Sequence, residues 1–255
     1  MSNDPIHQFH VNNNVDVPLG ELPWGLGHLA FNDAALFMGL SVAGAAGFMM
    51  WAMRPAAVVP GRAQVVAEGA YSFIHSMVKD AAGEEGVKRF FPFVFTLFLF
   101  IFAANMLGMF PYFFTPTSQI IITATMALMV FFTVITVGIA KNGFKFLKLF
   151  VPSGVPWYIL WFVVIIEIIS FFSRPLSHAV RLWANVLAGH LVLKVFAGFV
   201  PMMAAAGGIW ILGSVLPLTM TVALYALEFL VAFLQAYVFA LLTCIYLNDA
   251  LHPGH

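Results

Sequence analysis

The chain has 255 residues, of which 62% are hydrophobic and only 9% are charged, and its mean hydropathy is +0.96. Soluble globular domains contain about 45–50% apolar and about 25% charged residues, so the composition excludes that class and predicts a polytopic membrane protein. The formal net charge is +0, and we expect no nucleic-acid partner. The single cysteine, Cys244, excludes an internal disulfide.

The first 32 residues contain acids and histidines but no lysine or arginine. They lack the basic region followed by an apolar core that marks a cleavable signal peptide, so we expect a polar tail at 1–32. The following stretch, 34–53, is apolar over about twenty residues, which is the length a helix needs to cross a hydrocarbon core of about 30 Å. It is the first predicted membrane span.

The next segments alternate between amphipathic and apolar character. The segment 60–83 has apolar residues at roughly helical spacing, interrupted by charges, which predicts a helix on the membrane surface. A solvated helix that packs on its own chain is the alternative. The apolar stretches 90–110 and 119–140 predict the second and third spans, and a polar turn at 111–118 joins them.

Basic residues orient the predicted spans. The positive-inside rule places loops rich in lysine and arginine in the cytoplasm. The tail and the 111–118 turn have no basic residue, so the N-terminus is predicted to face outward and the C-terminus to be cytoplasmic. The basic residues on the cytoplasmic side would be Arg54, Arg62, Lys79, Lys88, Arg89, Lys141, Lys145 and Lys148.

Two long apolar segments, 155–198 and 209–249, complete the chain. As helices with a rise of 1.5 Å per residue, each would be about 60 Å long, twice what a perpendicular span requires. Two long tilted helices are favoured over four short spans because no strong turn signal divides them, whereas 199–208 contains Pro201 and paired glycines. The predicted fold class is an all-α polytopic membrane protein with three roughly perpendicular spans, one surface amphipathic helix and a hairpin of two long tilted membrane helices.

Polar side chains recur along the predicted hairpin. Residues seven apart share a helix face, and residues four apart lie close to it. One stripe on the first long helix comprises Glu167, Arg174, His178, Arg181 and Asn185, and the second long helix has Glu228 and Gln235 seven apart. Placing an ionisable side chain at membrane depth costs free energy. Such a residue is therefore by default a functional one that has a partner.

The antiparallel register of the hairpin predicts two pairs of residues at matching depth. His190 falls at the depth of Glu228, and Arg181 falls at the depth of Gln235. The first two residues could form a buried proton-exchanging pair, or a static hydrogen bond between helices. No carboxylate of the chain lies near Arg181, which suggests that another subunit supplies one. The alternative is that Gln235, backbone carbonyls and water satisfy it, while Arg174 could snorkel to the interface.

These residues carry a resemblance to a known family. RLWANVLAGH, preceded by SRPLSHAV and followed by LQAYVFALLTCIYL, closely resembles subunit a of the F-type, proton-transporting ATP synthase. The stretches DPIHQF and FAANMLGMFPYFFTPT are similar to the same family, so the resemblance runs nearly end to end.

The resemblance implies a rotary mechanism with two offset aqueous half-channels. It implies that Arg181 faces the rotating ring of subunit c, attends the ring carboxylate and bars a proton leak, with Asn185 and Gln235 beside it. The inner half-channel would run near Glu167 and Arg174, and His178 would also belong to the proton path.

The outer half-channel would contain His190 and Glu228. Many bacterial members of the family carry an acid in place of His190 and a histidine in place of Glu228, whereas mitochondrial relatives share the arrangement seen here. The exchange keeps a proton-exchanging couple and leaves open which member titrates first.

The resemblance also implies partners and a location. The partners would be the subunit c ring, subunit b of the stator stalk, the remaining ATP synthase subunits and membrane lipid. No cofactor, no metal and no catalytic site on this chain are expected. The location would be the bacterial inner membrane, with the mitochondrial inner membrane as the second possibility.

Ionisable residues within the membrane also occur in other classes of membrane protein. A secondary transporter or an ion channel of another class predicts inverted repeats with broken helices, and the sequence has no convincing self-similarity. A haem protein using His178 or His190 would need a facing histidine, and the second long helix has none before His252.

Overall fold

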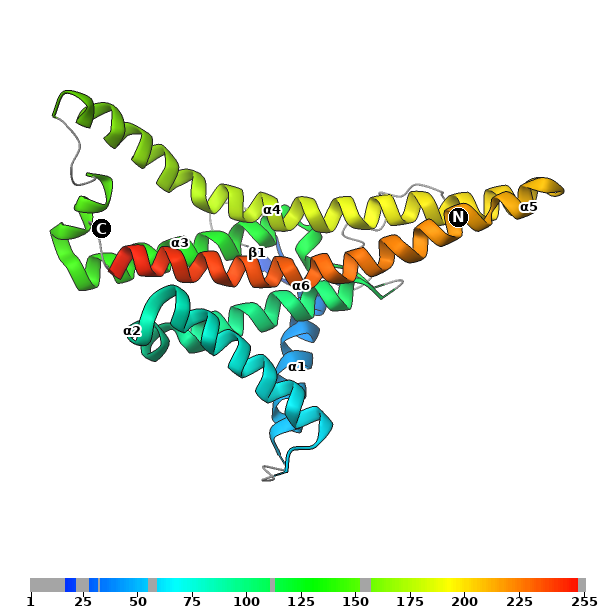
Figure 1. Ribbon diagram of the computed structural model, residues 1–255, viewed down its shortest axis with the longest axis horizontal. Helices are drawn as coiled ribbons and strands as arrows, with labels where there is room; N and C mark the ends of the chain where they lie inside the picture. Colours follow the sequence, from blue (N-terminus) through cyan, green and yellow to red (C-terminus); the bar gives the residue numbers. More distant parts are fainter. Residues whose placement is uncertain are drawn as a thin grey trace. The chain divides into compact units, whose positions relative to one another are not determined.

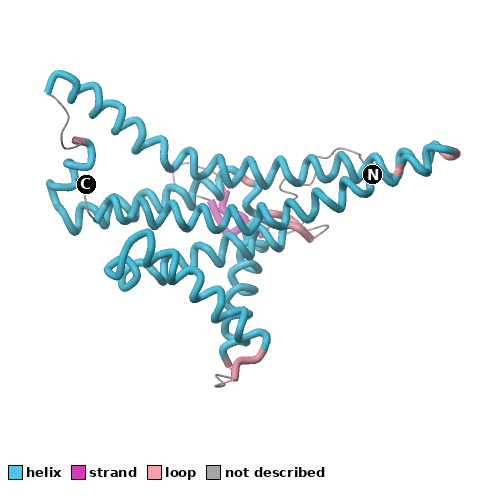
Figure 2. Tube along the Cα trace, in the orientation of Figure 1, coloured by secondary structure: helices cyan, strands magenta, loops and turns pink. Residues whose placement is uncertain are grey.

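Helices make up nearly all of the structure, as the ribbon and the tube show (Figure 1 and Figure 2). The computed structural model describes residues 17–21, 28–31, 33–54, 59–110, 113–151 and 157–251. The elements in chain order are β1 (Val17–Glu21), β2 (His28–Phe31), α1 (Asp33–Met53), α2 (Arg62–Gly108), η4 (Pro116–Ser118), α3 (Ile120–Asn142), η5 (Gly143–Phe150), α4 (Trp157–Ala206), α5 (Ile209–Gly213) and α6 (Val215–Leu251).

The predicted all-α membrane fold is confirmed. Within the described residues, five helical segments are long and apolar enough to cross a membrane: Asp33–Met53, Arg62–Gly108, Ile120–Asn142, Trp157–Ala206 and Ile209–Leu251. One feature was not predicted: β1 and β2 pair as a small antiparallel sheet within the tail. The rest of the predicted tail lies outside the described residues.

The chain divides into two compact units. Unit 1 comprises Met1–Ala45, Phe100–Gln119 and Trp183–Gln235, and unit 2 comprises Ala46–Leu99, Ile120–Leu182 and Ala236–His255.

In unit 2 the predicted surface helix forms the first part of α2. Gly83 has φ 68° and ψ −177°, which interrupts the helical backbone and divides α2 into two helical stretches. The first stretch packs on the second, where the Tyr71 and Phe91 rings lie 4.7 Å apart. Ile74 and Val78 are 0% exposed. The segment 60–83 therefore packs on its own chain along one face, and its place on the membrane surface stays a prediction.

The remaining core of unit 2 comes from α3, η5 and the ends of α4 and α6. Phe131 of α3 lies 5.1 Å from Phe171 of α4, measured between ring centroids. A Cβ on Gly138 would collide with Phe146 of η5, so only glycine allows this close approach. Cys244 of α6 is 1% exposed within this core.

The long segment after η5 forms one helix, α4, of 50 residues, and it ends later than predicted. The sequence placed the end at residue 198, because Pro201 and the paired glycines predicted a turn at 199–208. In the structure the helix continues to Ala206 and the chain turns at Gly207 and Gly208, with φ 71° and 58°. Positive φ angles favour glycine, while membrane helices tolerate an internal proline. Figure 1 shows α4 leading through this turn into α5.

Replacing Gly83 with alanine should lower the free energy of unfolding by about 1–3 kcal/mol, because its backbone conformation is essentially restricted to glycine. Thermal unfolding of the detergent-solubilised protein measures the effect. Gly69→Ala is the matched control, since Gly69 lies inside the helix and an added Cβ would meet nothing within 4 Å. Equal stability of the two variants would contradict the argument.

Candidate functional site

A partly buried acid and a partly buried histidine meet in unit 1. The Nδ1 atom of His190, on α4, lies 3.2 Å from Oε1 of Glu228, on α6, and each side chain is 11% exposed. This contact confirms the meeting that the antiparallel register predicts. Gly189 makes it possible, because a Cβ there would lie 3.0 Å from Oε1 of Glu228. Two ionisable groups of limited exposure thus face one another across the hairpin.

The opposite side of the histidine ring faces a hydroxyl. The Oγ1 atom of Thr115 lies 3.3 Å from Nε2 of His190, and Thr115 is 3% exposed. The same hydroxyl donates a hydrogen bond to the carbonyl oxygen of Gly108 at 3.3 Å. A Cβ on Gly108 would collide with Thr115. Both ring nitrogens of His190 therefore have polar neighbours.

Further polar contacts tie the region around Thr115 to α6. The amide of Asn105 donates to the carbonyl of Ala232 at 3.3 Å, and Thr117 donates to the amide oxygen of Asn105 at 2.7 Å. The Tyr225 hydroxyl donates to the carbonyl of Met109 at 2.8 Å. These bonds reach α6 on both sides of Glu228 in sequence, so they fix the segment that carries Thr115 beside the His190–Glu228 pair.

A charged cluster lies in unit 2. The guanidinium of Arg174 is 3.2 Å from Oδ2 of Asp249 and 3.7 Å from Oε1 of Glu167. It also lies 5.0 Å from the centroid of the Tyr246 ring. The predicted stripe placed Glu167 and Arg174 on one face, and the structure adds Asp249 from the end of α6. Arg174 is therefore held by two carboxylates rather than left to snorkel.

His178 lies next to this cluster and is buried. It is 4% exposed, and its Nε2 atom lies 3.2 Å from the carbonyl oxygen of Phe239. Its Nδ1 atom has no hydrogen-bond partner among the described residues. A buried contact with α6 distinguishes His178 from Arg181 and Asn185, which are exposed.

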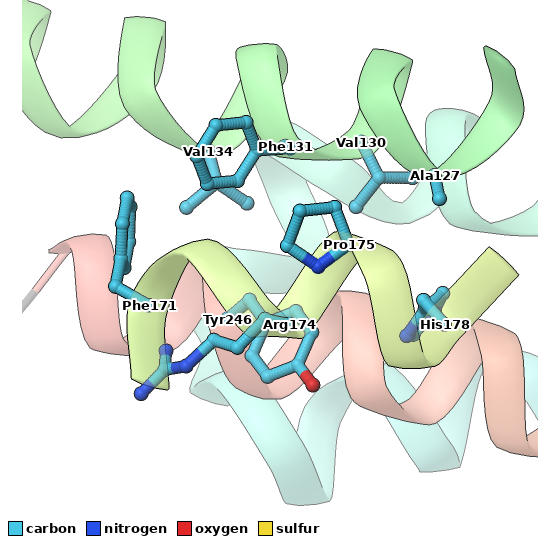
Figure 3. A pocket seen from close by; sticks show the side chains of 9 residues that line it. All are labelled: Ala127, Val130, Phe131, Val134, Phe171, Arg174, Pro175, His178 and Tyr246. Carbon is cyan, nitrogen blue, oxygen red and sulfur yellow. The ribbon is translucent and has the colours of Figure 1, made fainter. Parts of the chain in front are cut away.

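A small, mainly apolar pocket adjoins His178. Figure 3 shows its lining side chains, with Pro175 directed toward α3 and with Arg174 and His178 toward opposite ends. The lining residues are Ala127, Val130, Phe131, Val134, Phe171, Arg174, Pro175, His178 and Tyr246. The charged Arg174 and the unbonded Nδ1 atom of His178 thus adjoin the same cavity within unit 2.

The remaining predicted residues belong to different units. Arg181 is in unit 2, and in the described part of the chain no carboxylate forms an ion pair with it. Asn185 and the half-buried Gln235 are in unit 1. The meeting of Arg181 with Gln235 stays a prediction. Among the described residues, no group of three or more His, Cys, Asp or Glu could hold a metal ion.

Comparison with known proteins decides the family. The model of the family described as ATP synthase A chain matches residues 35–248. The chain belongs to this family. Subunit a of the ATP synthase from Rhizobium etli is 58% identical over 254 residues, which are 100% of this chain and 99% of that protein.

Two further relatives give the same result. ATP synthase subunit a from Sinorhizobium fredii is 58% identical over 254 residues, again 100% of this chain and 99% of the relative. The protein of the same name from a Chelativorans species is 56% identical over 255 residues and is covered completely. The resemblance seen in the sequence is therefore confirmed along the whole chain.

Three polar residues of this ATP synthase A chain were missed from the sequence. Asn105 lies within an apolar predicted span, and Thr115 lies in a turn that was treated only as polar. Asp249 stands near the end of α6, outside the polar stripe that was predicted from the sequence. The hydroxyls of the FTPTS sequence next to a predicted span were the one available signal for Thr115.

The contact between His190 and Glu228 can be tested through stability. We expect His190→Ala and Glu228→Ala each to destabilise the protein, and the double variant to cost less than their sum by about 0.5–3 kcal/mol, since contacting residues are not additive. Unfolding of the four proteins in detergent gives the coupling energy. A control cycle pairs His190→Ala with Thr219→Ala, whose hydroxyl bonds only within α6. Additive effects in the first cycle would contradict a direct contact.

Proposed function

We propose that this chain is the stator subunit of a rotary ATP synthase and that it passes protons to and from the carboxylates of a rotating subunit c ring. Two offset aqueous half-channels would connect the ring with the two sides of the membrane. Family membership supports a role in proton-driven ATP synthesis. The single observation that carries the mechanism is the contact of the partly buried His190 with the partly buried Glu228 within membrane helices.

The outer half-channel would contain this pair. Histidine changes charge near neutral pH, and a neighbouring carboxylate can exchange a proton with it. Nδ1 and Oε1 lie 3.2 Å apart, and Oε1 makes no hydrogen bond among the described residues, so a small reorientation of either side chain would align the pair for proton exchange. A proton that enters from the outer side would pass this pair and neutralise a ring carboxylate, which could then face lipid at a lower free-energy cost.

The inner half-channel would run along the charged cluster of unit 2. Arg174 with its carboxylates Glu167 and Asp249 supplies charged, half-buried groups that water can solvate. His178 lines the adjoining pocket, and its Nδ1 atom retains a hydrogen-bonding position for water. A ring carboxylate that reaches this region would lose its proton to the cytoplasm.

Arg181 would separate the two paths. Its guanidinium stays protonated at any working pH, so it cannot relay a proton, and it favours the ionised form of a carboxylate nearby. Its exposure, together with the lack of an ion pair in the described residues, leaves it available to carboxylates of another subunit. Asn185 and Gln235 would lie beside it. Each charge that crosses gains about 2.3 kcal/mol per 100 mV.

The proposed setting is a bacterial inner membrane, in accordance with the bacterial relatives. The N-terminus would face outward and the C-terminus the cytoplasm, as the distribution of lysine and arginine indicates. Further partners would be subunit b of the stator stalk, the remaining ATP synthase subunits and membrane lipid. The segment 60–83 would lie at the cytoplasmic surface.

Arg181→Ala should abolish proton-driven ATP synthesis and leave the complex assembled, because the ring carboxylate loses its permanent counter-ion. ATP synthesis by energised membrane vesicles is the measurement, and co-purification of the subunits tests assembly. Arg89→Ala is the matched control, since Arg89 is an exposed arginine outside the hairpin and should tolerate the change. Normal coupling in the Arg181 variant would refute the assigned role.

A cysteine at Asn185 should cross-link to a small ring subunit, because this residue is exposed on α4 four positions after Arg181. Cross-linking in membranes followed by mass spectrometry identifies the product. A cysteine at Leu187, two residues further along α4 and on a different face, is the control. A ring subunit attached at Leu187 and not at Asn185 would contradict the proposed interface.

A further inference from the structure

A row of polar atoms extends from the chain around η4 to α6. The carbonyl oxygen of Gly108, the hydroxyl of Thr115, the two ring nitrogens of His190 and the carboxyl of Glu228 follow one another with separations of 3.3, 3.3 and 3.2 Å across their contacts. All belong to unit 1. The proposed function uses only the last two residues of this row.

The position of the hydroxyl hydrogen of Thr115 determines which ring nitrogen of His190 carries a hydrogen. A threonine hydroxyl has one donor and two acceptor positions. Because Thr115 donates to the carbonyl of Gly108, it can only accept from His190. The Nε2 atom of His190 therefore carries a hydrogen. The other nitrogen, Nδ1, then lies 3.2 Å from Oε1 of Glu228, an atom that makes no hydrogen bond among the described residues and is therefore open to exchange a proton with it.

We propose that Thr115 is a positioning residue for proton exchange, which holds His190 in the tautomer that directs Nδ1 toward Glu228. Within the pair, the Oε1–H bond of Glu228 breaks as the Nδ1–H bond of His190 forms, and the reverse step restores it. Neutral histidine with a carboxylic acid thus becomes imidazolium with a carboxylate. The pair has no net charge in either form, which suits a site with 11% exposure.

The surrounding chain maintains this arrangement. Gly108 and Gly189 are the two positions where a Cβ would crowd Thr115 or Glu228. The bonds from Tyr225 to Met109 and from Asn105 to Ala232 fix the chain before Thr115 to α6. Thr115 is 3% exposed, and the chain before it is bonded to α6, so its hydroxyl stays within reach of His190.

The charges that face His190 are few in the described structure. Glu228 faces it from α6, and Lys194 acts on it from its own helix, α4. The segment around η4 contributes the uncharged Thr115. A change in the pH dependence of a Thr115 variant would therefore arise from the lost hydroxyl and not from a removed charge.

The test removes the hydroxyl and keeps the shape. Complete ATP synthase carrying Thr115→Val is compared with Thr115→Ser, which retains the hydroxyl, by ATP-driven proton pumping in membrane vesicles across a range of pH. Since a hydrogen bond contributes about 0.5–1.5 kcal/mol, Thr115→Val should slow pumping about 2- to 12-fold. The variant no longer accepts from Nε2–H, so the protonated pair is lost at lower pH and the alkaline limb should move downward by about 0.3–1 pH unit.

Controls separate the hydroxyl from packing. Thr115→Ser should stay within about twofold of the natural protein. Thr221→Val, which removes a hydroxyl that bonds to Pro217 within α6, should change neither rate nor pH profile. If Thr115→Val does not assemble, Thr115→Ala is judged by the same criteria. A natural rate and pH profile in the hydroxyl-free variant, or an equal loss in Thr115→Ser, overturns the assignment.

This inference rests on the proposed function, and the two fail in different ways. If the natural complex pumps no protons, or Arg181→Ala remains coupled, the proposed function is wrong. If Arg181→Ala is inactive while Thr115→Val behaves like the natural protein, only the role of Thr115 is wrong.

Discussion

The structure depends on how ionisable side chains are paired inside an apolar chain. A helix satisfies its own backbone within the membrane, but a buried carboxyl or imidazole needs a partner from elsewhere. In unit 1 that partner is reached across the hairpin, between His190 and Glu228. In unit 2 the two carboxylates around Arg174 have the same effect. Among the described residues, these ionisable groups of each unit thus lie beside a partner of opposite chemical character.

These polar contacts require a close approach of neighbouring segments. Glycine, which has no side chain, leaves room for that approach. Gly189 admits the carboxyl of Glu228, and Gly108 admits Thr115. Hydrogen bonds are stronger in a region of low dielectric, and an unpaired polar group there is more costly. Glycine positions and polar contacts therefore constrain one another in unit 1.

The sequence predicted much of the helical frame and one contact of the site. Apolar run length predicted the membrane helices, and the antiparallel register paired His190 with Glu228. The predicted turn at 199–208 contained both Pro201 and the paired glycines, but α4 continues through Pro201 and the chain turns only at Gly207 and Gly208. Thr115 could not be predicted from helical periodicity, because it lies outside the helices and reaches His190 through tertiary packing.

Cys244 gives unit 2 a natural probe of its own integrity. Its thiol belongs to the only cysteine of the chain and is 1% exposed in the packed core. Alkylating reagents attack the solvent-accessible thiolate, so they reach this side chain only when the surrounding helices open. The rate at which Cys244 is alkylated in native membranes therefore measures how often the surrounding helices open, and the measurement requires no introduced label.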